Sequence, residues 1–169
     1  MSYSASLFAD YHQIHIFDDG STTSLGDAWL TETATATNLA VEADAIAVGT
    51  TVNVFVDVTV DILDRDPGDD SADFDHVAEA SLRSASGRLV VMGCTGYEPD
   101  ADRIAVPAGW LRLRASRRNL DAAWEADLAS DDDPDTTEQV RIQVWPADPA
   151  KTELIKLWQP TEHPSTHVS

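Results

Sequence analysis

The sequence predicts an all-β protein, an antiparallel two-sheet β-sandwich with at most one or two short helical turns. The clearest evidence is the segment Thr51–Leu63, in which every second residue from Val52 to Val60 is a valine. A period of two fits a strand with one buried face, whereas a helix would scatter these valines around its circumference. Turn residues separate this segment from similar ones at spacings typical of a sandwich or a barrel, of which we favour the two-sheet sandwich.

Several further segments show the same alternation or a short apolar run. They are Tyr11–Phe17, Val77–Leu82, Leu89–Met92, Trp110–Ala115, Val140–Trp145 and Leu154–Trp158. In the first of these, the alternation places His12 on the inner face together with Ile14 and Ile16. Two short apolar pieces, Leu39–Val41 and Ile46–Val48, either pair with each other or lead into the valine strand.

Helical signals are weak. The segment Asp27–Asn38 is the best helix candidate, with Asp27 as the N-cap, but its threonines leave a loop as the alternative. Asn119–Leu128 is expected to form one or two turns. We expect a single domain over residues 1–160, followed by a flexible polar tail over residues 161–169.

The chain is strongly acidic. Its 169 residues contain 30 Asp and Glu against 11 Lys and Arg, which gives a net charge of −19. Such a surface repels nucleic acids and anionic membranes, so neither is an expected partner. No apolar run approaches the roughly 20 residues of a membrane span. The first ten residues lack the pattern of a signal peptide, and Cys94 alone forms no internal disulfide, so we expect a cytoplasmic protein.

One acidic loop offers a candidate calcium site. Ca²⁺ takes six to eight oxygen ligands, and loops at the end of a sandwich supply them. The loop departs from the EF-hand pattern in its glycine, its last ligand position and its flanking strands. A solvated charged loop is the competing interpretation. The candidate ligands are Asp64, Asp66, Asp70, Asp73 and Asp75, with Asp131–Asp135 as a second donor segment.

Catalytic motifs are absent from the sequence. His76 follows two aspartates, but no Gly-x-Ser-x-Gly elbow is present and nothing links His76 to Cys94. Phosphate-binding and dinucleotide-binding glycine patterns are missing as well. His12 and His15 would lie on opposite faces of a strand, so they cannot share a metal ion. We therefore favour a protein that is not an enzyme and that needs no cofactor. The alternative is an enzyme whose catalytic residues form no pattern visible in the sequence.

The main cluster of basic residues follows Trp110. Arg112 and Arg114 share one strand face with this tryptophan, a combination that is common at interaction surfaces. The three residues are thus candidates for partner binding. The competing interpretation is cross-strand pairing of the arginines with acids such as Asp57 or Asp61.

Two resemblances add to these patterns. The first is carried by Asp10–Ile14, Gly26–Trp29, Leu39–Val41, Ile46–Thr50, Asp75–Leu82, Ser86–Leu89 and Val140–Pro146. With these segments, most of the chain resembles a family of uncharacterised bacterial β-sandwich proteins, common in actinobacteria, which implies a fold and no activity. The second is carried by the Tyr-His-Gln segment and the Trp29 region alone, which resemble competence protein J, an inhibitor of a DNA-entry nuclease.

The sequence therefore favours an acidic protein-binding domain. Its expected partner is a basic protein, such as a nuclease or toxin that it inhibits or confers immunity against, because carboxylates imitate the phosphates of DNA. The alternative is a sandwich module that binds Ca²⁺ or a small ligand without catalysis. A third interpretation is that the acidity has no specific role and reflects a GC-rich coding sequence or adaptation to a salt-rich cytoplasm.

Overall fold

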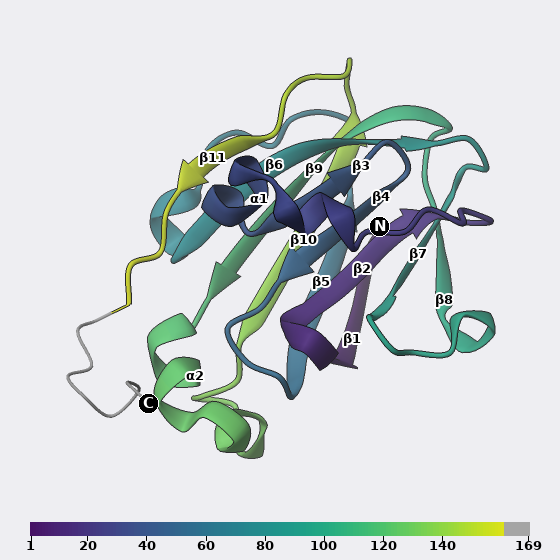
Figure 1. Cartoon of the computed structure of the whole chain (residues 1–169). Coiled ribbons are helices and arrows are strands. Elements are labelled where there is room, and N and C mark those ends of the chain that lie inside the picture. Colours follow the sequence, from purple (N-terminus) through teal and green to yellow (C-terminus); the bar gives the residue numbers. More distant parts are fainter. Residues whose placement is uncertain (161–169) are drawn as a thin grey trace.

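The computed structural model describes residues 1–160, which form two β-sheets and several short helices (Figure 1). The larger sheet has six strands in the order β1-β5-β10-β9-β6-β11 and the smaller has five in the order β3-β4-β2-β7-β8. The first sheet comprises β1 (Ser2–Phe8), β5 (Phe55–Ile62), β6 (His76–Ser84), β9 (Gly109–Arg118), β10 (Gln139–Pro146) and β11 (Glu153–Lys156). The second comprises β2 (Gln13–Asp18), β3 (Leu39–Glu42), β4 (Ala45–Gly49), β7 (Arg88–Gly93) and β8 (Asp102–Ala105).

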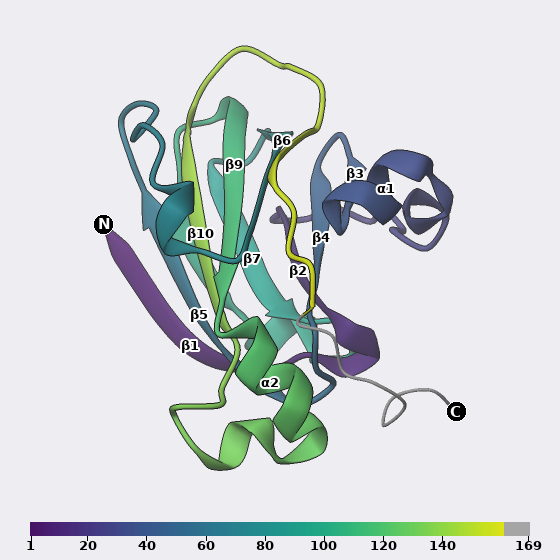
Figure 2. The same cartoon turned by 90° about the vertical axis from the view of Figure 1, so that its left-hand side faces the viewer.

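The valine pattern forms the centre of the core, as predicted. Val56, Val58 and Val60 of β5 are buried, and Val52 and Val54 before the strand are buried too. They belong to one hydrophobic cluster that also contains Ile14 of β2 and Ile142 of β10, so side chains from both sheets pack together. Figure 2 shows β5 and β10 on one side of the molecule and β3 and β4 on the other.

Most expected strands are confirmed, but the sheets hold two additional ones. β1 and β8 lie outside every predicted segment, and β3 and β4 pair with each other as one of the two alternatives proposed. The expectation of purely antiparallel sheets is wrong at one place, since β10 runs parallel to β5. The chain enters β10 from β9, its antiparallel neighbour, so the direction of β9 rather than that of β5 determines the direction of β10.

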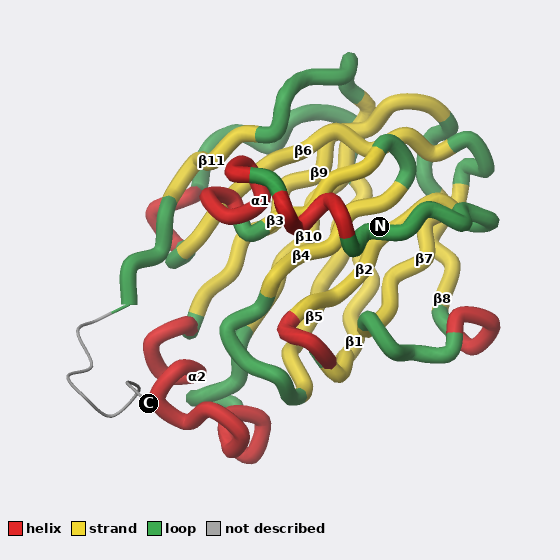
Figure 3. Tube along the Cα trace, in the orientation of Figure 1, coloured by secondary structure: helices red, strands yellow, loops and turns green. Residues whose placement is uncertain are grey.

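Helical structure exceeds the expected one or two short turns (Figure 3). The Asp27–Asn38 segment forms a 3-10 helix at Asp27–Leu30 and then α1 (Glu32–Thr37). The side chain of Thr31, rather than that of Asp27, caps α1 by accepting a hydrogen bond from Ala34 N. α2 (Leu120–Ala126) continues into a 3-10 helix at Asp127–Asp132. Within residues 1–160, no helix is long and apolar enough to cross a membrane.

His12 does not point into the core as expected. Strand β2 begins one residue later, and His12 lies exposed in a 3-10 turn with φ of +58°, next to Tyr11 with φ of +56°. Left-handed backbone at two consecutive non-glycine residues breaks the strand alternation before Gln13. The predicted tail at 161–169 lies outside the described residues.

A loop that crosses the outer face of the larger sheet positions the candidate site. β5 and β6 run in the same direction but are separated by β10 and β9, so residues 63–75 must travel from the end of β5 back to the start of β6. The segment carries the predicted calcium ligands. We call it the crossing loop.

Candidate functional site

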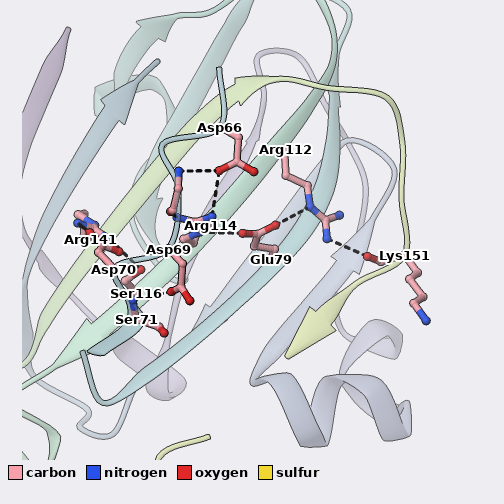
Figure 4. A network of polar contacts seen from close by, with 11 residues as sticks. Asp66, Asp69, Asp70, Ser71, Glu79, Arg112, Arg114, Ser116, Arg141 and Lys151 are labelled. Carbon is pink, nitrogen blue, oxygen red and sulfur yellow. Dashed lines mark hydrogen bonds and ion pairs between the residues drawn. The ribbon is translucent and has the colours of Figure 1, made fainter. Parts of the chain in front are cut away.

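The crossing loop is attached to the sheet by a network of ion pairs (Figure 4). The outer face of β6, β9 and β10 is polar because residues that alternate with core positions point away from the hydrophobic cluster. Among them are Glu79, Arg112, Arg114 and Arg141. The crossing loop covers one side of these side chains, and residues 147–152 cover another.

Glu79 is the centre of this network. Its carboxylate is buried and accepts hydrogen bonds from Arg112 Nε at 3.1 Å and from Arg114 Nε at 2.7 Å. Arg112 also donates to the carbonyl oxygens of Ala150 and Lys151, at 3.2 Å and 2.9 Å. One carboxylate therefore balances two buried guanidinium groups, and one of these holds the segment before β11.

The other arginines fix the crossing loop. Arg114 donates to the Gly68 carbonyl and pairs with Asp66 at 3.3 Å. Arg141 makes two hydrogen bonds of 2.7 Å to the two carboxylate oxygens of Asp70, and this arginine lowers the pKa of that carboxyl. The guanidinium of Arg141 also stacks over the Phe74 ring, 4.2 Å from its centroid. The two-pronged contact between Arg141 and the Asp70 carboxylate belongs to the strongest class of hydrogen bonds in proteins.

The five predicted calcium ligands are thus placed in different roles. Asp66 and Asp70 bind arginines, while Asp75 Oδ2 accepts a hydrogen bond from the backbone N of Leu120, at the start of α2. Asp64 and Asp73 are exposed. Over residues 1–160, no group of three or more His, Cys, Asp or Glu side chains is arranged to hold a metal ion.

We expect Ca²⁺ to leave the melting temperature unchanged. A ligand that binds only the native state stabilises it, so a site with millimolar affinity would raise the melting temperature when Ca²⁺ is added in large excess. Here arginines occupy Asp66 and Asp70, so Ca²⁺ would have to displace them. Differential scanning fluorimetry with and without 10 mM Ca²⁺, with Mg²⁺ as the control, measures this. A rise specific to Ca²⁺ would contradict the arrangement.

The three predicted partner-binding residues differ in their exposure to solvent. Trp110 is 37% exposed, but Arg112 and Arg114 are 6% and 5% exposed and form internal ion pairs. Their partner is Glu79 on β6, not Asp57 or Asp61 on β5. β9, which carries the two arginines, lies directly beside β6, whereas β10 separates β9 from β5. Glu79 was visible in the sequence as the polar position that alternates with Ala78 and Ala80.

Carboxylates that are exposed or half-buried gather along β5 instead. Asp57 and Asp61 alternate with the buried valines and therefore lie on the outer face, and Asp64 follows the end of the strand. At its start, Asp131 Oδ2 accepts a hydrogen bond from Phe55 N at 3.2 Å, which brings the second acidic segment to the same strand. We call this set the acidic stripe, and it comprises Asp57, Asp61, Asp64 and Asp131.

A separate cavity of about 400 Å³ lies on the outer face of the smaller sheet. Its lining includes His15, Trp29, Met92 and Cys94. Gln13 Oε1 receives hydrogen bonds from Trp29 Nε1 at 3.0 Å and from His15 Nε2 at 2.8 Å. Burial lowers the pKa of His15, and burial together with Asp10 raises the pKa of the Cys94 thiol. A protonated thiol is a weak nucleophile, so this shift disfavours Cys94 as a nucleophile.

Comparisons with known proteins show the fold. No family model and no curated protein match the chain. Two solved structures resemble it. ComJ from Bacillus subtilis, an inhibitor of the DNA degrading activity of NucA, matches 87% of this chain and 98% of its own with a TM-score of 0.65 and 14% identity. A protein named crocagin biosynthetic gene J matches 86% of this chain and 97% of its own, with a TM-score of 0.61 and 18% identity. The resemblance to competence protein J is therefore confirmed at the level of the fold.

Proposed function

We propose that this protein is an acidic binding domain that inhibits a basic, DNA-degrading nuclease. The observation that carries the proposal is the similarity of fold to ComJ, which spans nearly the whole length of that inhibitor. An inhibitor that fills the DNA-binding cleft of a nuclease needs a surface that competes with DNA. A surface rich in carboxylates offers anionic oxygens in place of the phosphates. The charge distribution supplies such a surface.

Internal pairing removes most positive charge from the surface. Among residues 1–160, eight ion pairs join six arginines to six carboxylates. Three of these arginines, Arg112, Arg114 and Arg117, are buried. Most of the 30 Asp and Glu residues of the sequence take no part in these pairs. Association with a basic protein is then accelerated by electrostatic attraction and weakened by salt.

The acidic stripe is the part of this surface that we assign to the nuclease. It follows β5, whose eight residues span roughly 27 Å at about 3.4 Å per residue. Its carboxylates come from β5 and from the two acidic segments that follow β5 in the sequence. The fold therefore brings together residues that are far apart along the chain. A basic cleft that holds a stretch of DNA backbone matches such a row of negative charges.

The test is inhibition of DNA degradation by a nuclease captured on the immobilised protein from lysate of its own source and eluted with salt. We expect the variant Asp57→Asn/Asp61→Asn/Asp64→Asn to raise the inhibition constant about tenfold or more at low salt, since three carboxylates of the stripe lose their charge. The matched control, Asp27→Asn/Glu32→Gln/Asp148→Asn, removes the same charge from exposed positions outside the stripe. Equal weakening by both variants would show that net charge alone acts, and would remove the stripe from the proposal.

A further inference from the structure

The first strand of the larger sheet has an open edge. β1 is the end strand of the order β1-β5-β10-β9-β6-β11, and within the described residues only its β5 side is paired. With seven residues it is longer than β3, β8 and β11, the other three end strands, which have four each. Its sequence, Ser-Tyr-Ser-Ala-Ser-Leu-Phe, contains no charged residue and no proline. Proteins ordinarily protect such edges with lysines, prolines or bulges, because a free edge pairs with another chain.

The hydrogen-bonding pattern shows which backbone groups are free. Met1 and Ile62 exchange hydrogen bonds with each other, and at the far end Ala9 N donates to Val54 O. Hydrogen-bonded and non-hydrogen-bonded pairs alternate along an antiparallel ladder, so the odd-numbered residues of β1 bond to β5. The N–H and C=O groups of Ser2, Ser4 and Ser6 consequently point away from β5, toward the open edge.

A groove runs along this edge between the two sheets. It has a volume of about 490 Å³, with Tyr3, Ala5 and Leu7 of β1 on one wall and the β7–β8 connection on the other. The groove is closed at one end, where a Cβ on Gly93 would lie 2.3 Å from the Phe8 carbonyl oxygen. Tyr97, which is 70% exposed, stands at its margin. An exposed aromatic ring beside a half-apolar groove is typical of sites that bind protein segments.

The charges at the groove are of one sign. Its lining includes Asp100 and Asp102 and contains no lysine, arginine or histidine. Tyr3 OH donates to Asp102 Oδ2 at 2.6 Å, which leaves the second oxygen of this carboxylate at the surface. A second copy of the chain would bring another net charge of −19 and the same two aspartates to this edge. The electrostatics thus favour a basic occupant over self-association.

We propose that an extended, basic segment of the partner protein binds in this groove and adds a strand to β1. Backbone hydrogen bonds to Ser2, Ser4 and Ser6 hold the segment, as in other cases of strand addition. Alternate side chains of the segment enter between Leu7 and Tyr97, and its lysines or arginines meet Asp100 and Asp102. The inference rests on the proposed function for the identity of the partner, whose remaining surface contacts the acidic stripe on the neighbouring strand.

The test uses a displayed library of random linear peptides of about ten residues, enough to span β1, selected on the immobilised protein at low salt. We expect the selected peptides to alternate apolar residues with Lys or Arg. The variant Ser4→Pro/Ser6→Pro removes two backbone N–H groups at the open edge. It should bind a synthetic copy of a selected peptide about tenfold or more weakly. The control variant Ser4→Ala/Ser6→Ala keeps both N–H groups and should bind within about threefold of the unaltered protein.

A measurement on the unaltered protein makes the result independent of how well the proline variant folds. Amide hydrogen exchange should be fast at Ser4 and Ser6 and slow at Ala5 and Leu7 in the free protein, and peptide binding should slow it at the serines alone. Peptides that leave the serine amides unprotected would overturn the proposal, as would a dimer that the proline variant dissociates. If the proline variant inhibits the nuclease as well as the unaltered protein does, the groove is not the binding site, but the proposed function stands. If peptides bind at the edge and no nuclease is inhibited, the groove stands and the proposed function fails.

Discussion

Removal of the buried carboxylate at Glu79 should reduce stability more than any other single change in the ion-pair network. In Glu79→Ala, the guanidinium groups of Arg112 and Arg114 remain buried without their shared counter-charge. Breaking a buried pair from one side costs about 3–5 kcal/mol, because the remaining charge is left uncompensated. The free energy of unfolding, measured by urea denaturation, should fall by that amount. Both covering segments should also become susceptible to proteolysis.

A matched variant tests whether burial is the reason. Asp66 pairs with the same Arg114, but its side chain is 64% exposed. Exposed pairs contribute about 0–1 kcal/mol, so Asp66→Ala should change the free energy of unfolding by less than about 1 kcal/mol. A loss in Asp66→Ala as large as that in Glu79→Ala would mean that the crossing loop, rather than the charge balance beneath it, determines stability.

His76 should make the protein less stable in mild acid. Its Nε2–H donates to the Thr37 carbonyl at 2.8 Å, and its Nδ1 accepts from Trp158 N at 3.1 Å, so only the neutral ring satisfies both contacts. Burial and the charge of Arg117 lower the pKa of His76 to about 4. The unfolded chain binds this proton near pH 6.5, so below that pH unfolding takes up a proton. Stability is therefore full above pH 6.5 and should fall by roughly 3 kcal/mol as the pH decreases to about 4.

The pH dependence of the free energy of unfolding, measured from pH 7 to pH 4, checks this prediction. His76→Gln removes the titrating ring, and we expect it to flatten the curve over this range. His12→Gln, at an exposed histidine, should leave the slope unchanged. A slope that persists in His76→Gln would assign the acid sensitivity to other groups.

The strands were predictable where the two faces differ in polarity. The valines of β5 alternate with polar residues, and β2, β6, β9 and β10 show weaker forms of the same pattern, so their core faces follow from the sequence. β1 was missed although Ser2, Ser4 and Ser6 alternate with Tyr3 and Leu7. Its inward residues lie at the margin of the core, where only partial burial is required, and the apolar signal is correspondingly weak.

The candidate site was less accessible to sequence reasoning because it depends on strand order. The dense run of aspartates indicates a metal site or a solvated loop when considered alone. Once β10 and β9 lie between β5 and β6, the loop must cross the arginine-bearing face, and Asp66 and Asp70 become partners of Arg114 and Arg141. No local pattern specifies that order. The same applies to the acidic stripe, which is assembled by a contact between Phe55 and Asp131, 76 residues apart in the sequence.

The most direct test of the account is a titration of the captured nuclease with the purified protein, with DNA degradation as the readout. We predict complete inhibition near one equivalent at low salt and progressive loss of inhibition as the salt concentration rises. We also predict that the stripe variant inhibits less strongly than its charge-matched control. DNA degradation that continues in the presence of excess protein at low salt would contradict the central claim, whatever else the protein binds.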